Sequence, residues 1–366
     1  MTLGDGLRGR DNALNLVRLL LAGAVVLSHT RPVGGFGPDP TLGGRGLGSW
    51  AVAGFFAISG YLICASRERL PWKDFVVSRM LRIYPGYWLS LLAVAGVFAP
   101  VAAVTTGTDF DGSAALSFVL VNLVAPVQFA FGDALTRAAH PEAWNAPLWT
   151  LSPEMLCYTV AGVALTSMVV RRRTVLFSWA ALVAVTASPL LLGAAHRLSA
   201  GPLLDFLHLL GFFTAGALAW ALRDRITIRT PFMALSLAAL CVVGLAHATN
   251  ELAALPLAYL VLAVGCVARP GFTRELDLSY GLYILSWPIQ TTLYLMGVAR
   301  LGWAAYCSLT FAIAVPVAYA SWTCVEKPAL GLRRRLRGPT RHDSLVPVGR
   351  TAPAPAAIAP GASQEA

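Results

Sequence analysis

Charged residues are scarce in this sequence. They make up 13% of 366 residues, whereas soluble globular proteins carry about 25%. Hydrophobic residues make up 57%, and no hydrophilic stretch is long enough to fold by itself. Apolar runs of roughly 20 residues, the length that crosses a bilayer as a helix, recur instead from end to end. The composition therefore excludes an ordinary soluble domain and predicts an all-α, polytopic integral membrane protein.

Two further absences narrow the class. The apolar runs do not alternate between apolar and polar residues, which excludes a porin-like β-barrel. The six cysteines fall inside apolar runs at irregular spacing, so they predict neither a metal site nor a disulfide framework. The net charge of +10 would be compatible with binding to nucleic acid. In a membrane protein, however, an excess of Lys and Arg usually lies in the cytoplasmic loops. We expect a lipid bilayer as partner, no nucleic acid and no metal.

The charge distribution decides how many apolar runs cross the membrane. Eleven runs are candidates, and the run at 113–131 is doubtful because it contains Asn122, Pro126 and Gln128. If it crosses, the arginines at 171–173 and every later basic loop fall outside, against the positive-inside rule. If it is interfacial or re-entrant, five of the 28 basic residues remain outside: Arg31, Arg45, Arg137, Arg197 and Arg300. The sequence thus predicts about ten transmembrane helices with both termini cytoplasmic, in the inner (plasma) membrane.

The chain divides into one large unit and a tail. We expect residues 1–337 to form a single membrane-embedded domain. Residues 338–366 are rich in Pro, Ala and Ser and lack apolar periodicity. This composition predicts a disordered cytoplasmic tail.

Two ionisable residues interrupt the first apolar run, LVRLLLAGAVVLSHT (16–30). Arg18 and His29 are separated by three helical turns plus about 20°, so they share one face and lie about 16 Å apart along the axis. In one interpretation Arg18 snorkels to the inner headgroups and His29 caps the outer end of its helix. In the other, which the pairing on one face favours, both line a shared polar channel. There a neutral imidazole would serve as a general base, and activity would fall as the pH drops through its pKa.

Three other polar insertions have open interpretations. Arg79 and Arg82, in RMLRIYPGYW, either anchor a helix at the interface or bind the phosphates of a cytosolic donor. Glu154, in NAPLWTLSPEMLCY, is either a first-turn carboxylate favoured by the helix dipole or a group that orients catalysis or holds a substrate hydroxyl. Asp205 and His208 lie three apart on one helical face, and a structural hydrogen bond explains them more simply than a second acid–base pair.

Taken together, these stretches resemble the acyltransferase-3 family of membrane-bound bacterial O-acyltransferases. The resemblance covers most of the chain, from about Asn12 to Leu336, and depends on the order and spacing of several motifs. They are the Arg-x10-His first span, GFFAISGYLI (54–63), the Arg-x-x-Arg pair before IYPGYW, WTLSPEMLCY, LSYGLYILSWPI (278–289) and the closing EKP (326–328).

The resemblance implies an activity and roles for particular residues. It implies transfer of an acyl group, often acetyl, from cytosolic acyl-CoA to a sugar hydroxyl, such as that of a carbohydrate, an envelope glycan or a glycosylated metabolite. His29 then matches the family's essential histidine, and Arg18 its partner on the first span. Arg79 and Arg82 match the donor-associated pair, and Glu154 matches the acidic position of the tryptophan-led motif.

One departure and two alternatives stay open. Where many members carry His, this chain has Ser286, so that position is either dispensable or linked to a different handling of the acceptor. An alternative function is a transporter or exporter of glycans or small molecules that uses Arg18, His29 and Glu154 as a proton relay. A weaker alternative is a scaffold for envelope assembly.

Overall fold

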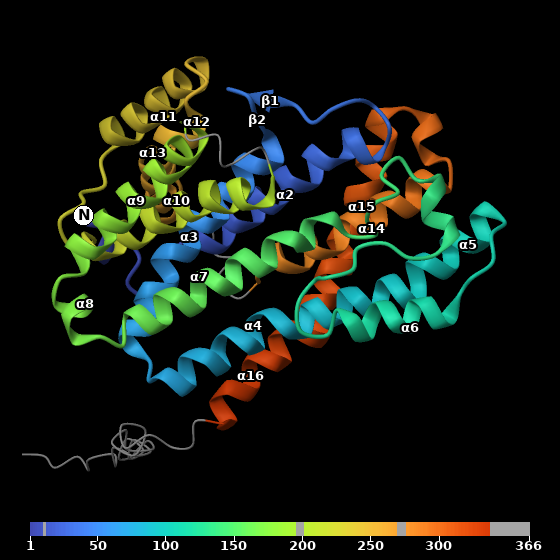
Figure 1. Cartoon of the computed structure of the whole chain (residues 1–366), viewed down its shortest axis with the longest axis horizontal. Coiled ribbons are helices and arrows are strands. Elements are labelled where there is room, and N and C mark those ends of the chain that lie inside the picture. The colour runs from blue at the N-terminus through green and yellow to red at the C-terminus, as the bar shows by residue number, and fades with distance from the viewer. Residues whose placement is uncertain (10–11, 195–200, 269–275, 337–366) are drawn as a thin grey trace, which may run out of the picture.

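The computed structural model describes residues 1–9, 12–194, 201–268 and 276–336, and these are almost entirely helical (Figure 1). The predicted tail at 338–366 lies outside the described residues. The main helices are α2 (Leu14–Val33), α3 (Leu47–Arg69), α4 (Trp72–Ala93), α5 (Ala99–Thr106), α6 (Gly112–Val121), α7 (Leu151–Ala164), α9 (Thr174–Ala194), α10 (Pro202–Ala221), α11 (Thr230–Leu245), α13 (Ala254–Val267), α14 (Ser279–Leu295) and α15 (Trp303–Ser321). The shorter elements include α1 (Leu3–Gly6), β1 (Thr41–Leu42), β2 (Arg45–Gly46), α8 (Met168–Arg172), α12 (Thr249–Leu252) and α16 (Lys327–Leu336). Short 3-10 or π-helical segments lie at Val94–Phe98, Asp133–Arg137, Ala146–Thr150, Val298–Leu301 and Trp322–Glu326.

Five of the described helices are long and apolar enough to cross a membrane. They are Leu14–Val33, Leu47–Arg69, Trp72–Thr106, Leu203–Ala221 and Trp303–Leu332. Shorter apolar helices, among them α7, α9, α11, α13 and α14, occupy the remaining predicted spans. Large apolar side chains also cover the outside of the bundle; Val104 is 85% and Leu245 83% exposed. Such a surface suits lipid rather than water, which confirms a helical, polytopic membrane protein.

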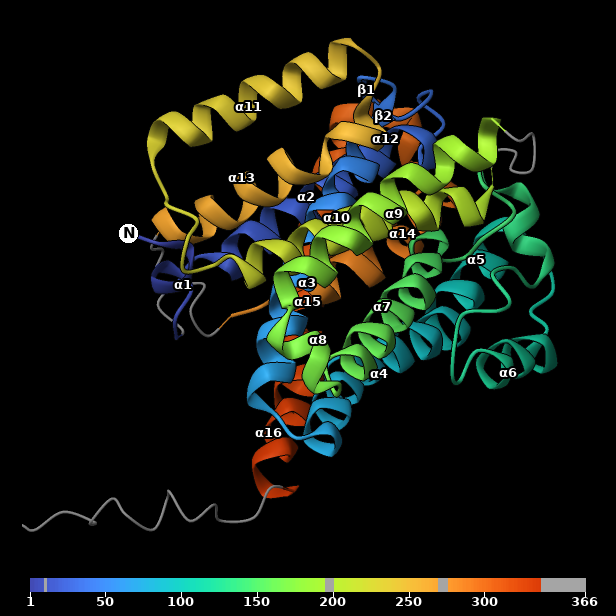
Figure 2. The same ribbon diagram turned by 60° about the vertical axis from the view of Figure 1, so that its left-hand side comes forward.

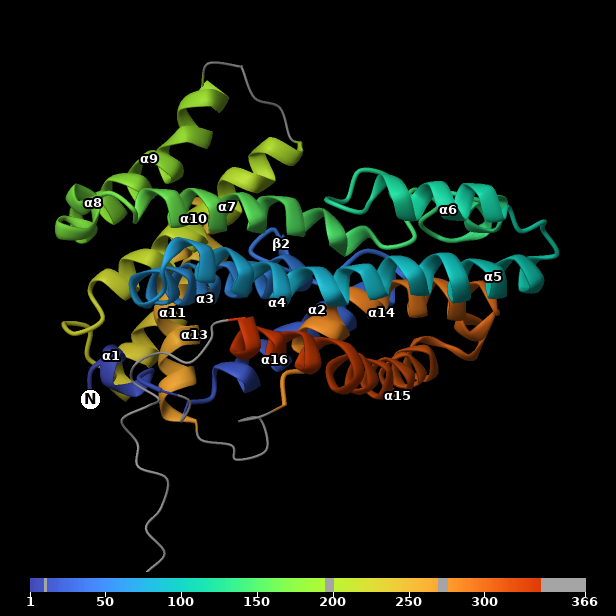
Figure 3. The ribbon, with the colours of Figure 1, turned by 90° about the horizontal axis from the view of Figure 1, so that it is seen from below.

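The doubtful run at 113–131 does not form a spanning helix. Helix α6 has ten residues, about 15 Å of rise, roughly half of a hydrocarbon core. Asn122 ends it by accepting hydrogen bonds from the backbone N–H groups of Val127 and Gln128, at 2.7 and 3.0 Å. Tyr87 and Trp88 of α4 hold the loop that follows by donating to the carbonyls of Asn122 and Leu123, at 2.6 and 2.8 Å. Helix α6 therefore lies alongside the long α4–α5 helix (Figure 3).

Helices α2 and α14 form the centre of the bundle. Helix α2 packs against α3, α13 and α14, and α14 packs on its other side against α15. Helices α3 and α10 approach closely because each carries a glycine at the crossing: a Cβ on Gly60 would overlap the carbonyl of Phe213, and one on Gly216 that of Ala57. Small residues allow such close crossings inside membranes. Helix α11 lies at the edge, against α13 (Figure 2).

The first and last described elements meet at one end of the bundle. Segments from α1 and α16 line a common cavity there, and α1 is fixed by backbone hydrogen bonds from Leu3 and Gly4 to the carbonyls of Ile226 and Arg223. The β1–β2 hairpin lies at the opposite end, where Thr249 donates to the Gly43 carbonyl. The sequence predicts that the first of these two ends is cytoplasmic.

Candidate active site

A large, positively charged cavity opens at the end that carries α1 and α16. It measures about 1000 Å³, and we call it the arginine cavity after its basic lining: Arg8, Arg18, Arg69, Arg79, Arg82, Arg223 and Lys327. Glu68, Asp224 and Asp277 are the carboxylates in the same lining. The basic excess gives the cavity a positive potential that attracts anions such as phosphate groups. Arg79 lines this cavity while its guanidinium donates to the hydroxyls of Ser66 and Ser78.

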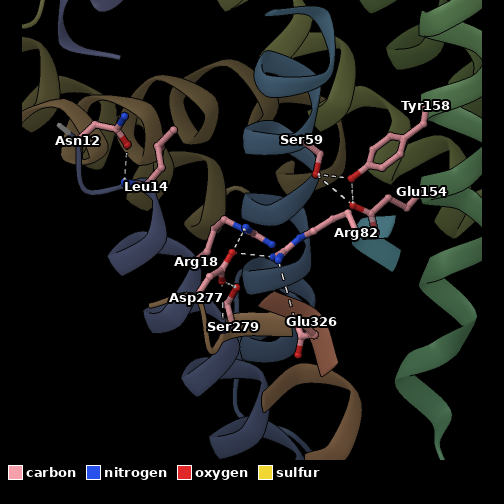
Figure 4. A network of polar contacts seen from close by, with 10 residues as sticks. All are labelled: Asn12, Leu14, Arg18, Ser59, Arg82, Glu154, Tyr158, Asp277, Ser279 and Glu326. Carbon is pink, nitrogen blue, oxygen red and sulfur yellow. Dashed lines mark hydrogen bonds and ion pairs between the residues drawn. The ribbon is translucent and has the colours of Figure 1, made fainter. Parts of the chain in front are cut away.

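At the floor of the arginine cavity, two partly buried arginines converge on one carboxylate (Figure 4). Arg18 of α2 and Arg82 of α4 each lie 2.7 Å from Oδ2 of Asp277, in the turn before α14. Ser279 donates to the other oxygen of Asp277 at 2.5 Å. Glu326, 2% exposed, lies 3.9 Å from the second terminal nitrogen of Arg82.

This network satisfies charges that would otherwise be costly inside the bundle. A buried ion needs a partner of opposite sign and good hydrogen bonds, and removal of one partner costs about 3–5 kcal/mol. Asp277 receives two cations and a hydroxyl, so its charge is balanced from three elements. The network also ties α2, α4 and the start of α14 together, and thereby fixes where Arg18 and Arg82 point.

A narrow cavity continues beyond the two arginines. This middle cavity measures about 60 Å³, and Arg18 and Arg82 line it as well. Glu154, in the first turn of α7, faces into it and accepts hydrogen bonds from the hydroxyl of Ser59 at 3.2 Å and from that of Tyr158. The remaining wall is mostly aromatic: Phe55, Phe56, Tyr158, Tyr280 and Tyr283. Glu154 therefore has a solvating shell of its own and makes no contact with His29.

A third cavity surrounds His29 near the far end of α2. This histidine cavity measures about 190 Å³ and is also lined by Arg45, Trp149, Asp205 and Trp287. The ring of Trp287 stands edge-on to His29, with centroids 4.9 Å apart. Among the described residues nothing bonds Nδ1 of His29, although that atom is buried.

Trp287 also contacts a second histidine. His140 lies in the loop before α7, and its ring centroid is 5.6 Å from that of Trp287. Its Nδ1 lies 2.6 Å from a carboxylate oxygen of Glu142. Partial burial raises the pKa of Glu142, but a backbone hydrogen bond and the His140 ring lower it more, so its pKa lies below the usual value.

The three cavities adjoin one another in a row. Arg18 and Arg82 belong to the walls of both the arginine cavity and the middle cavity. Val52, Thr150 and Tyr283 belong to the walls of both the middle cavity and the histidine cavity. The predicted face of α2 thus borders the whole row, with Arg18 at one end and His29 at the other.

The structure groups the residues selected from the sequence into three places. Arg79 lies in the arginine cavity, Arg18 and Arg82 lie at its junction with the middle cavity, and Glu154 lies in the middle cavity. His29 lies in the histidine cavity. Asp205 joins His29 there, which the spacing of Asp205 and His208 did not indicate.

Sequence analysis missed the carboxylate at the centre of the network. Asp277 directly precedes the motif LSYGLYILSWPI but was not selected, and Glu326 was noted only as the start of EKP. A signal existed: two arginines inside apolar segments require buried acids, and acidic residues at the edges of apolar runs are few in this chain. The pairing itself spans 259 residues for Arg18, which spacing along the chain does not reveal.

The fold and the cavities define a polytopic membrane protein whose buried ionisable groups line an interior path. The sequence model of the acyltransferase-3 family, described as an acyltransferase domain, matches residues 11–321. The chain belongs to this family and is an enzyme of the O-acyltransferase type.

The chain is also similar to two curated proteins over most of its length. The chain is 25% identical over 334 residues to an O-acetyl transferase of Shigella phage Sf6, covering 87% of this chain and 96% of the relative. It is 26% identical over 370 residues to nodulation protein 10 of Rhizobium leguminosarum bv. viciae, covering 90% and 95%. Among solved structures, none matches the chain significantly.

Proposed function

We propose that the protein transfers an acyl group, with acetyl expected, from cytosolic acyl-CoA to a hydroxyl of a sugar, an envelope glycan or a glycosylated metabolite. We place it in the plasma membrane, with the arginine cavity toward the cytosol. The observation that carries the proposal is the row of three cavities, which links a basic, phosphate-attracting opening to an imidazole deep in the bundle. The similarity to the phage relative, an O-acetyl transferase, supports an oxygen acceptor and an acetyl group.

The donor would bind in the arginine cavity by its anionic end. Guanidinium groups match phosphate oxygens in geometry and charge, and Arg79 faces this cavity. Arg82 has a more restricted role, because Asp277 and Glu326 already flank it. We assign phosphate binding to Arg79 and its basic neighbours, and we assign Arg18 and Arg82 to the entrance of the narrow path.

The pantetheine arm would extend through the middle cavity and present the thioester to His29. The arm is slender and uncharged and contains amide groups. The aromatic wall and the hydroxyls beside Glu154 offer it apolar contact and hydrogen bonds. Glu154 in this scheme positions the arm through Ser59 and Tyr158, whereas His29 acts on the reacting atoms.

Two chemical routes are available at His29. In direct transfer, the imidazole removes the proton of the acceptor hydroxyl, the oxygen attacks the thioester carbonyl, the C–S bond breaks and the departing thiolate takes up the proton. In the carrier route, a ring nitrogen attacks the thioester first and releases the thiol, and the acceptor hydroxyl then attacks the acyl-imidazole. Incubation with radiolabelled acetyl-CoA without acceptor distinguishes them, because only the carrier route leaves label on the protein.

The test of the proposed function compares cells with and without the gene. Mass spectra of glycans and hydroxylated metabolites should show one species that gains an acyl increment when the gene is present. The increment should disappear when His29→Ala replaces the native chain at equal abundance in the membrane. Spectra with no acyl difference, or an increment that persists with His29→Ala, would overturn the proposal.

A further inference from the structure

Three side chains lie at the boundary between the middle and histidine cavities. Val52 of α3, Thr150 just before α7 and Tyr283 of α14 are the residues that line both cavities. We call these three residues the constriction. The middle cavity that leads to it, about 60 Å³, has about a third of the volume of the histidine cavity beyond, about 190 Å³.

The constriction is held in place by hydrogen bonds and ring packing. The hydroxyl oxygens of Tyr283 and Thr150 lie 2.8 Å apart, and the Tyr283 hydroxyl donates to the Pro147 carbonyl at 3.1 Å. Phe55 packs edge-on against the Tyr283 ring, with centroids 6.0 Å apart. Tyr283 and Thr150 are 8% and 5% exposed. Rotation of Tyr283 out of the junction would break these bonds inside a close-packed wall, so the opening has a fixed shape.

If the donor enters from the arginine cavity, as the proposed function holds, the acyl group leads and must pass the constriction first. Every atom of the acyl group then meets Val52 and Tyr283 before the thioester reaches His29. A slender chain fits through such an opening, but a group branched beside the carbonyl presents a wider cross-section. Rigid pockets that discriminate by one methyl or methylene typically give about 10- to 200-fold differences in rate.

We infer that Val52, Thr150 and Tyr283 determine acyl specificity and restrict the donor to small, unbranched acyl groups. This inference rests on the proposed function and adds to it the chemical class of the donor. Val52 sets the width on one side through its two methyl groups. Thr150 and Tyr283 set it on the other side through their hydrogen bond.

The test measures transfer of different acyl groups by the full-length protein in detergent. Membranes from cells that lack the gene serve as the acceptor source, and the donors are radiolabelled acetyl-CoA and isobutyryl-CoA. For the native chain we expect the isobutyryl rate to be at least about 10-fold below the acetyl rate. Val52→Ala, which widens the opening, should raise the ratio of isobutyryl to acetyl transfer by about 10-fold.

Two further variants keep the test decisive. Val25→Ala makes the same truncation at a fully buried valine that lines none of the three cavities, so the ratio should not change. Thr150→Val keeps the size of the side chain but removes its hydrogen bond to Tyr283, so the ratio should rise by a smaller factor than in Val52→Ala. If Val52→Ala does not fold, Thr150→Val tests the constriction in its place.

The possible failures are distinguishable. Equal rates with both donors in the native chain would overturn the inference and leave the proposed function in place. An equal change of the ratio in Val25→Ala and Val52→Ala would also overturn it, because general loosening would then explain the effect. Absence of transfer from both donors would overturn the proposed function itself.

Discussion

The two ends of α2 handle buried polarity in opposite ways. At the Arg18 end, Asp277 receives two guanidinium groups and a hydroxyl, and Glu326 accepts from Ser321 and lies 3.9 Å from Arg82, although its Oε2 lacks a hydrogen bond among the described residues. At the His29 end, Nδ1 of the imidazole has no partner within the described chain. On α14 nearby, the side-chain oxygens of Ser286, Gln290 and Thr291 are likewise buried without one.

This difference indicates a structural role for one end of α2 and a chemical role for the other. Buried polar groups are normally hydrogen-bonded, and an exception in a native fold calls for an explanation. The Arg18 end, where Asp277 is paired, is suited to hold helices together and to present two arginines in a fixed geometry. The His29 end, where buried polar atoms lack partners, is suited to receive atoms that the protein does not supply, such as those of a thioester and a hydroxyl. We therefore expect variants at one end to affect stability and variants at the other to affect rate.

The largest effect on the rate of acyl transfer is expected at the His29 end of α2. His29→Ala should lower acyl transfer by about 100-fold or more, the range typical of general acid–base groups. Its melting temperature should change little, because Nδ1 has no hydrogen bond to lose. Initial rates and thermal unfolding in detergent measure both quantities. Retention of more than about a tenth of the native rate would contradict the assigned role.

The largest effect on stability is expected at the Arg18 end of α2. Asp277→Asn leaves two partly buried arginines facing a buried neutral amide and should lower the free energy of unfolding by about 3–5 kcal/mol. Asp224→Asn is the matched control, because Asp224 is 67% exposed and lies 3.9 Å from Arg223. That exposed pair should contribute less than about 1 kcal/mol. If the two variants unfold at the same temperature, the network is not the structural element described above.

An intermediate effect is expected in the middle cavity. Glu154→Gln replaces charge-assisted hydrogen bonds with neutral ones, each weaker by about 1 kcal/mol. Transfer should fall by about 10-fold, mainly through a higher KM for the donor, because Glu154 positions the arm without touching the reacting atoms. Tyr158→Phe, which removes one of the two donors to Glu154, should give a smaller shift in the same direction. An effect on kcat alone would show that Glu154 acts in the chemical step.

The smallest effect is expected at the position that departs from the family pattern. Ser286 is fully buried and its hydroxyl has no partner in the described chain. Ser286→Ala removes an unsatisfied polar atom, so stability should be unchanged or higher by up to about 1 kcal/mol. The rate should stay within about twofold if the position is dispensable. A large loss of rate at unchanged stability would instead link Ser286 to the acceptor.

The sequence predicted the fold well where the signal is local. Apolar runs of membrane-spanning length predicted the helical bundle, and the positive-inside rule predicted correctly that 113–131 is not a spanning helix. The side chain of Asn122 explains that outcome, because it satisfies the backbone of the loop that ends α6. Helical periodicity likewise placed Arg18 and His29 along a single face of α2, and both border the row of cavities.

The rest of the site depends on packing between distant segments. Arg82 and Asp277 are 195 residues apart, so no spacing rule identifies them as partners. The constriction likewise joins residues from α3, the turn before α7, and α14. Glu154 and His29 likewise line different cavities, which spacing along the chain does not reveal. Sequence thus identifies most of the ionisable groups, whereas the structure decides which of them act together.

The most direct test of the account asks whether an acyl group crosses the bundle. The protein is reconstituted in sealed vesicles, with radiolabelled acetyl-CoA on the side of the arginine cavity and the acceptor identified from the cell comparison on the opposite side. The account predicts that label appears on the acceptor while free CoA stays with the donor, and that Ser59→Trp, which fills the middle cavity, abolishes transfer. The account would be contradicted if label reached only acceptor placed on the same side of the membrane as the donor. Full activity in Ser59→Trp would also contradict it.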